Sequence, residues 1–187
     1  GRLGAGRGTR CDMSESTNKL DDVFALTDKI EVAMMTTRNA EGNLTARPMM
    51  TQDRQLSGDI WFMTNLETHK ISDLKEHPEV NLAYFDSGSK QWVSISGHAT
   101  VSRDPQRIRE LYKPSWKPWF TQEGAPRDGG PDDPRIALLD VRVNEASYYK
   151  LDQPRPIVLF KIALAAFSRN TPDIGDVQHV AAGEVHG

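Results

Sequence analysis

The sequence predicts a mainly β fold, a six-stranded antiparallel barrel that is closed or split and carries a few peripheral helices. Six segments have the alternation or the apolar, β-branched and aromatic content of strands. They cover residues 31–38, 44–52, 59–64, 79–86, 90–103 and 135–151. Several of the intervening turns are too short to carry the crossovers that a parallel sheet needs. The sequence has no internal repeat, GxGxxG fingerprint or P-loop, and its 187 residues favour one domain.

Four helices are expected around these strands. They cover 16–30, a segment that begins at Glu67 or Thr68 and ends before Pro78, a segment that begins at Asp104-Pro105, and 155–167. Apolar residues at helical spacing predict the first, and proline ends the second because it cannot continue a helix. Asp104 suits an N-cap and Pro105 the first helical position.

One folded domain is expected between two less ordered ends. Residues 1–15 are rich in Gly and Arg and are expected to form a disordered N-terminal extension. The barrel domain is assigned to 16–170. Residues 171–187 have turn signals and little periodicity, so we expect a flexible C-terminal tail.

The composition argues against several classes of function. The 23 basic and 26 acidic residues give a formal net charge of -3, so no general basic field favours a nucleic-acid partner. The longest apolar run, 156–167, contains Lys161 and is shorter than the roughly 20 residues that span a bilayer, so no membrane partner is expected. The single cysteine, Cys11, excludes an intramolecular disulfide and fits a cytoplasmic protein. The five histidines show no metal-ligand spacing, so no metal site is expected.

The segment IWFMTNLETHK, residues 60–70, points to an anion site. An apolar strand ends at Thr64, and a helix begins near Thr68. The first N–H groups of a helix lack intrahelical partners and lie at the positive end of its dipole, so a phosphate finds donors there. Thr68 would add a hydrogen bond and Lys70 a positive charge.

Arg47 is expected near the same place. It shares a strand face with Met49 and Thr51, and a meander of the first three strands would bring that face close to the end of the third. A guanidinium group binds phosphate through two parallel hydrogen bonds. Apolar walls are expected from Met49, Trp61 or Phe62, and Met63.

The phosphate site has a plain structural alternative. Lys70 can be a solvated helix residue, Arg47 a surface strand residue and Thr68 an ordinary helix cap. Spacing alone does not choose between the two interpretations.

Five segments in order resemble the general stress proteins of the pyridoxamine 5'-phosphate oxidase-like superfamily, which are flavin-binding split barrels. They read TARPMM, IWFMTN, THKISDLKEHPEVNLAYFD, KQWVSISGHATV and WKPWF...GGPDDPRIALLDVRVNEASYY, and the similarity runs from about Leu20 to about Leu151. The resemblance implies a six-stranded split barrel that works as a homodimer. It also implies that FMN, with FAD as the alternative, binds at the subunit interface.

The same resemblance implies the cofactor-binding residues. The implied contacts are Arg47, His69 and Lys70 on the flavin phosphate, Pro48, Met49, Met50, Phe62, Met63 and Thr64 along the ring, Gln91 on the ring, and Trp116 or Trp119 as an aromatic cover donated by the partner subunit. His69 stands where many relatives have Ser or Arg. A neutral imidazole there would weaken the phosphate site and make FMN affinity depend on pH.

Several of these residues have structural alternatives. Methionines in strands mostly fill cores, which applies to Met34, Met35, Met49, Met50 and Met63. Tryptophans in loops often seal a core or a dimer interface, which applies to Trp116 and Trp119.

The resemblance leaves two functional hypotheses. The preferred one is a stress-response oxidoreductase that uses bound flavin with a nicotinamide donor, and the alternative is a flavin carrier or sensor without turnover. No catalytic residue is predicted, because a flavin carries the redox chemistry itself. True pyridoxamine phosphate oxidases have an Arg-x-His type substrate signature near an Arg-Leu-x-Pro ending. The corresponding region here reads YYKLDQPRPIVLFKIALAAF, which argues against vitamin B6 synthesis. A haem, which superfamily relatives also bind, would need an axial histidine that the scattered histidines do not obviously provide.

Overall fold

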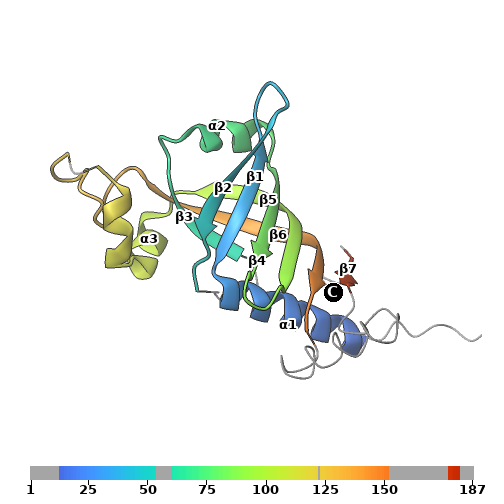
Figure 1. Cartoon of the computed structure of the whole chain (residues 1–187). Coiled ribbons are helices and arrows are strands. Elements are labelled where there is room, and N and C mark those ends of the chain that lie inside the picture. The colour runs from blue at the N-terminus through green and yellow to red at the C-terminus, as the bar shows by residue number, and fades with distance from the viewer. Residues whose placement is uncertain (1–12, 54–59, 122, 152–176, 182–187) are drawn as a thin grey trace, which may run out of the picture.

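The structure, a computed structural model, describes residues 13–53, 60–121, 123–151 and 177–181. Its helical elements and strands follow one another along the chain as Figure 1 shows. They are α1 (Met13–Ile30), β1 (Val32–Arg38), β2 (Leu44–Met50), β3 (Ile60–Asn65), α2 (His69–Glu76), β4 (Glu79–Phe85), β5 (Trp92–Ser102), α3 (Pro105–Leu111), the 3-10 helix η1 (Pro114–Trp119), β6 (Ile136–Tyr149) and β7 (Val177–Val180).

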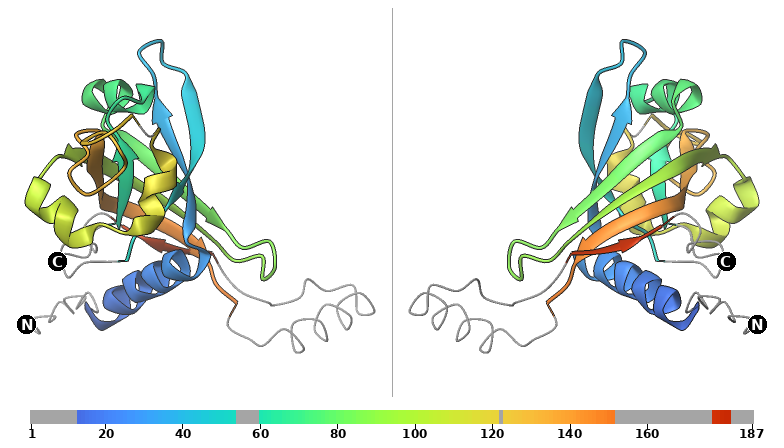
Figure 2. Two further views of the ribbon diagram at one scale, coloured as in Figure 1. Left: turned by 90° about the vertical axis from the view of Figure 1, so that its left-hand side faces the viewer. Right: turned by 90° about the vertical axis from the view of Figure 1, so that its right-hand side faces the viewer.

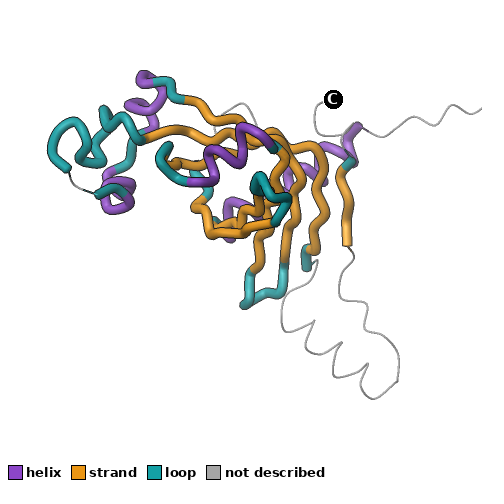
Figure 3. The backbone as a smooth tube through the Cα atoms, turned by 90° about the horizontal axis from the view of Figure 1, so that it is seen from above, coloured by secondary structure: helices purple, strands orange, loops and turns teal. Residues whose placement is uncertain are grey.

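The strands form one antiparallel sheet in the order β2-β1-β4-β5-β6-β3, and β7 pairs with β6. The sheet is curled rather than flat, with α1 across one end and α2 near the other (Figures 2 and 3). The predicted fold class, mainly antiparallel β with peripheral helices, is confirmed.

Two details of the predicted sheet are wrong. β3 does not continue a meander from β2 but pairs along its length with β6. Both faces of β3 are buried. Phe62 packs into the core cluster next to α1, whereas Trp61 packs into a second cluster with Ile108 of α3. The sheet also has seven described strands rather than six, since β7 is added at Val177–Val180.

β7 falls inside the range 171–187 that was expected to be a flexible tail. Its four residues are an ordered strand on the edge of β6, so that expectation does not describe Val177–Val180. The helix predicted over 155–167 lies outside the described residues. The assigned domain limits remain a prediction.

The core follows the predicted strand alternation. Val80, Leu82 and Tyr84 of β4 are buried, and the intervening residues are not. β5 behaves in the same way, with Val93 and Ile95 facing the core and His98 exposed. One face of α1 covers this core through Val23, Phe24 and Leu26, which sit in the same cluster.

The sheet does not close into a complete barrel. β2 and β3 are the two ends of the strand order, and they meet in one isolated bridge between Thr51 and Phe62. Beyond this bridge the facing edges of β2 and β3 are unpaired within the described sheet. The split between them is where a ligand can reach the interior.

The segments around this split are held by specific contacts. Trp116 of η1 donates its indole N–H to Gln52 Oε1 at 3.2 Å. On the other side, Arg127 forms two hydrogen bonds with the carboxylate of Glu67, at 2.9 and 3.0 Å, just before α2. The loop that carries Arg127 is fixed by a buried ion pair between Arg135 and Asp133, and hydrogen bonds from Arg135 lower the pKa of Asp133. No helix among the described residues is long and apolar enough to cross a membrane.

Candidate functional site

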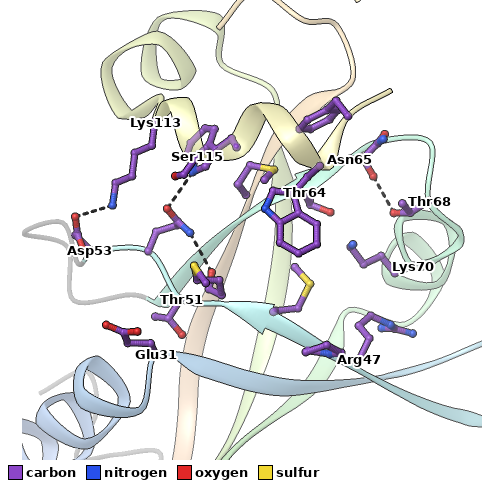
Figure 4. Close-up of a pocket in the computed structure, with 18 of the residues that line it drawn as sticks. Glu31, Arg47, Thr51, Asp53, Thr64, Asn65, Thr68, Lys70, Lys113 and Ser115 are labelled. Carbon is purple, nitrogen blue, oxygen red and sulfur yellow. Dashed lines mark hydrogen bonds and ion pairs between the residues drawn. The ribbon is translucent and has the colours of Figure 1, made fainter. Parts of the chain in front are cut away.

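A pocket of about 1130 Å³ occupies the split between β2 and β3. Its lining comes from the end of α1, from β2 and β3, from the start of α2 and from η1. Figure 4 shows that Arg47 and Lys70 lie on one side of the pocket, whereas Glu31, Asp53 and Lys113 lie on the other. The pocket therefore has a cationic end and an end that contains carboxylates.

The cationic end is built from two partly buried positive charges, those of Arg47 and Lys70. Burial lowers the pKa of Lys70, and the charge of Arg47 lowers it further. Burial also lowers the pKa of Arg47, and the carboxylate of Asp73 partly offsets that effect. Among the described residues no carboxylate forms an ion pair with either cation. An anion placed here would remove an unfavourable repulsion.

The start of α2 adds backbone donors to the cationic end. Thr68 is the N-cap residue and has an extended backbone conformation. Its hydroxyl donates to the carbonyl of Asn65 at 2.8 Å, so its proton is not directed at a ligand, contrary to the hydrogen bond that the sequence suggested. A helix contribution would come instead from the N–H groups of His69 and Lys70 at the start of α2, since the N–H group of Ile71 already donates to the carbonyl of Thr68 at 3.0 Å. His69 lies in this turn and is exposed.

Thr64 supplies a buried hydroxyl that lacks a partner. It lines the pocket from β3 and is 2% exposed, and its Oγ1 has no hydrogen-bond partner among the described residues. A buried polar atom of this kind costs free energy until it is paired. The hydroxyl is therefore available to a ligand in the split.

Sulfur and aromatic side chains form the apolar walls. Met49 is buried, Met63 is half-buried, and Met50 is 58% exposed at the rim. Met35, in contrast, is an ordinary core residue that does not line the pocket. The alternative assignment of methionines to the core thus holds for Met35 but does not describe Met50.

The two tryptophans line the pocket in different ways. Trp116 is 3% exposed and packs edge-on against Trp61 at 6.3 Å and Tyr112 at 5.7 Å. It is therefore a wall residue of its own chain, and a tryptophan cover from a partner subunit remains a prediction. Trp119 is 74% exposed, so the aromatic cover remains a prediction for Trp119.

Eleven of the thirteen residues that were expected to bind the cofactor line this pocket, and two do not. The eleven are Arg47, Pro48, Met49, Met50, Met63, Thr64, Thr68, His69, Lys70, Trp116 and Trp119. Phe62 is fully buried in the core cluster and does not line the pocket. Gln91 precedes β5 and accepts a hydrogen bond from Lys29 at 3.1 Å, away from the pocket lining.

The sequence reasoning missed several polar residues of the site. Gln52 and Thr37 are buried, and their side chains contact Trp116 and Arg47 respectively. Asp28 and Glu31 line the pocket because α1 ends there. Nothing in the sequence distinguishes these four polar residues from ordinary surface residues, so their places could not be predicted. Among the described residues no group of three His, Cys, Asp or Glu side chains gathers to hold a metal ion.

Comparisons with known proteins agree with this geometry. The family described as "Pyridoxamine 5'-phosphate oxidase like" matches residues 18–173. A curated relative, Protein bli-3 of Neurospora crassa, is 35% identical over 133 residues, which are 70% of this chain and 64% of that protein. The chain thus spans less than two thirds of the length of this relative.

Two solved structures share the fold. A general stress protein 26 from Jannaschia sp. CCS1 superposes with a TM-score of 0.70 at 22% identity, over 88% of this chain and 99% of that chain. The general stress FMN/FAD binding protein of Xanthomonas citri superposes with a TM-score of 0.58 at 26% identity, over 73% of this chain and 92% of that chain. The split-barrel architecture is therefore shared with these proteins.

The unneutralised cations predict an effect on stability. The pKa of Lys70 is lower in the folded protein than its ordinary value of 10.5, so its charge costs stability at neutral pH, and this cost disappears as the pH rises past the ordinary value. Lys70→Met should raise the free energy of unfolding of the ligand-free protein at pH 7, and the gain should shrink towards pH 10.5. Urea unfolding at several pH values measures this.

Lys75→Met is the matched control, because Lys75 is an exposed residue of the same helix and should give no such gain. A Lys70→Met protein that is less stable than the Lys75→Met protein at pH 7 would contradict the cost of placing the charge of Lys70 in this partly buried site beside Arg47.

Proposed function

Because the chain belongs to the pyridoxamine 5'-phosphate oxidase-like family, we propose that its pocket binds FMN, with the phosphate at Arg47 and Lys70. The observation that carries this proposal is the pair of partly buried cations without a counter-anion at one end of a pocket with apolar walls. A terminal phosphate supplies the missing charge. The name of the Xanthomonas citri relative, an FMN/FAD binding protein, supports the same ligand class.

The remaining pocket residues fit a flavin. Met49 and Met63 offer polarisable apolar surface for an aromatic ring, and the hydroxyl of Thr64 is buried without a partner. The facing edges of β2 and β3 leave backbone N–H and C=O groups for the polar rim of the ring. We propose FMN rather than FAD because the cationic end provides two positive side chains for one phosphate, and FAD remains the alternative.

When bound, FMN supplies two-electron redox chemistry. The residues of this chain would hold the phosphate, cover the ring and limit access of water. We propose a general stress protein that acts in the cytoplasm as an oxidoreductase with a nicotinamide donor. The alternative is a flavin carrier or sensor without turnover, and the reduction experiment below separates the two hypotheses.

An exposed apolar face supports the proposed homodimer. The face lies on β2, β1 and β4, where Val32 pairs with Met50 and Met34 lies between Pro48 and Ala83. Val32, Met34 and Met50 are 40%, 44% and 58% exposed. A continuous apolar patch of this kind favours association. Pro48 and Met50 also line the pocket, so a partner seated on this face would sit beside the bound ring.

FMN and riboflavin differ only in the phosphate, so their titration tests the proposed function. The protein should bind FMN more tightly than riboflavin, as measured by flavin fluorescence. Arg47→Met and Lys70→Met should each weaken FMN binding roughly 10- to 100-fold, the effect of losing a hydrogen bond to a charged group. Their riboflavin affinity should stay near that of the unchanged protein.

The control for this titration is Lys113→Met, which removes a cation from the opposite end of the pocket. A larger loss of FMN affinity in Lys113→Met than in Lys70→Met would place the phosphate at the Lys113 end of the pocket and contradict the proposal. Absence of flavin binding by the unchanged protein would refute the function.

Reduction of the bound flavin separates the two functional hypotheses. Mixing the FMN complex with NADH or NADPH without oxygen should bleach the visible flavin absorbance, faster than free FMN is bleached under the same conditions. A bound flavin that neither donor reduces above the rate of free FMN favours the carrier or sensor.

The homodimer is tested by placing a charge on the apolar face. Met34→Asp should convert a dimer to a monomer in sedimentation velocity, because a carboxylate buried at an interface without a partner is strongly unfavourable. Thr100→Asp, at an exposed position on β5, should leave the dimer intact. A monomeric unchanged protein, or a Met34→Asp protein that stays dimeric, would exclude this face as the interface.

A further inference from the structure

Thr37 contacts the side chain of Arg47 from the neighbouring strand. It is 1% exposed on β1, and its Oγ1 accepts a hydrogen bond from Arg47 Nη1 at 2.7 Å. In the β1-β2 register Thr37 pairs with Thr45, and Arg47 pairs with Met35. Thr37 and Arg47 are thus diagonal neighbours, at a separation that a long side chain can bridge.

The contact restrains the flexible and positively charged side chain of Arg47. An arginine side chain has many accessible rotamers, and Arg47 lies in a partly buried site close enough to Lys70 to lower the pKa of that lysine. Without a fixed partner the guanidinium group would gain by turning towards water, away from the second cation. The hydrogen bond to Thr37 opposes that movement.

The chemistry of the partner matters as well as its position. A carboxylate at this point would pair with Arg47 and cancel the charge that attracts an anion, whereas a hydroxyl holds one N–H and leaves the positive charge in place. Arg47 has five N–H donors, and the contact with Thr37 uses a single terminal nitrogen. The other N–H groups of the guanidinium group remain available to an oxyanion.

We infer that Thr37 is a positioning residue that pre-orients Arg47 for a terminal phosphate and thereby makes the pocket select phosphorylated flavin over flavin without a phosphate. The inference rests on the proposed function, because it assigns the specificity of the same pocket. Thr37 does not line the pocket and acts only through Arg47.

The test compares Thr37→Val, which keeps the shape of the side chain and removes its hydroxyl, with Thr37→Ser, which keeps the hydroxyl. The dissociation constants of FMN and riboflavin are measured for each in the full chain. Thr37→Val should weaken FMN binding roughly 3- to 10-fold, less than Arg47→Met, because Arg47 keeps its charge and loses only the restraint of one hydrogen bond. Its riboflavin affinity should not change, and Thr37→Ser should restore most of the FMN affinity.

Two outcomes overturn the inference. The first is an unchanged ratio of FMN to riboflavin affinity in Thr37→Val; if both affinities fall equally, the role of Thr37 is merely structural. The second is a Thr37→Ser protein that behaves like Thr37→Val. In each case the unchanged protein still binds FMN, so the proposed function survives. If the unchanged protein binds no flavin, the proposed function fails and the inference fails with it.

A double-substitution cycle gives a second measurement that is independent of small folding effects. In an Arg47→Met background, Thr37→Val should cause no further loss of FMN affinity, because Thr37 acts through the guanidinium group. If Thr37→Val folds poorly, Thr37→Cys keeps a similar shape with a much weaker acceptor and should rank between Thr37→Ser and Thr37→Val. Additive losses in the cycle would show that Thr37 acts by another route and would overturn the inference.

Discussion

The repulsion between Arg47 and Lys70 is the interaction on which the function of this fold depends. Burial lowers the pKa of Lys70 and the charge of Arg47 lowers it further. Among the described residues no carboxylate forms an ion pair with either cation. A protein keeps such an arrangement only if the surrounding structure stabilises it by other means. The unfavourable free energy of the two cations is confined to one end of the pocket, whereas the barrel core that stabilises the fold is extensive.

The strand order explains why the two cations meet. Arg47 is on β2 and Lys70 follows β3, and these strands are opposite ends of the sheet that touch at the Thr51–Phe62 bridge. Had β2 and β3 paired along their lengths, the split would be closed and Met49 would be a plain core residue. The hydrogen bond between Gln52 and Trp116 joins two residues of the pocket wall. The site is thus a consequence of incomplete barrel closure.

Much of this organisation could be predicted from the sequence. Strict alternation in β4 and β5 identified their buried faces, and Asp104 caps α3 as expected by accepting from the backbone N–H groups of Gln106 and Arg107. The sequence pointed to Arg47 and Lys70, because an arginine on a neighbouring strand and a lysine at the start of a helix can together bind a phosphate. The partner of β3 was not predictable, since Trp61 and Phe62 are apolar on both faces and alternation gives no register there. Thr37 was missed because a buried threonine and a surface threonine look the same in a sequence.

The most direct measurement of the central claim is a crystal structure of the full chain with FMN. The account predicts phosphate oxygens within about 3.2 Å of the Arg47 guanidinium group and of Lys70 Nζ, with the ring in the split between β2 and β3. A phosphate beside Lys113, or one that projects into solvent while Arg47 and Lys70 contact no anion, would contradict it.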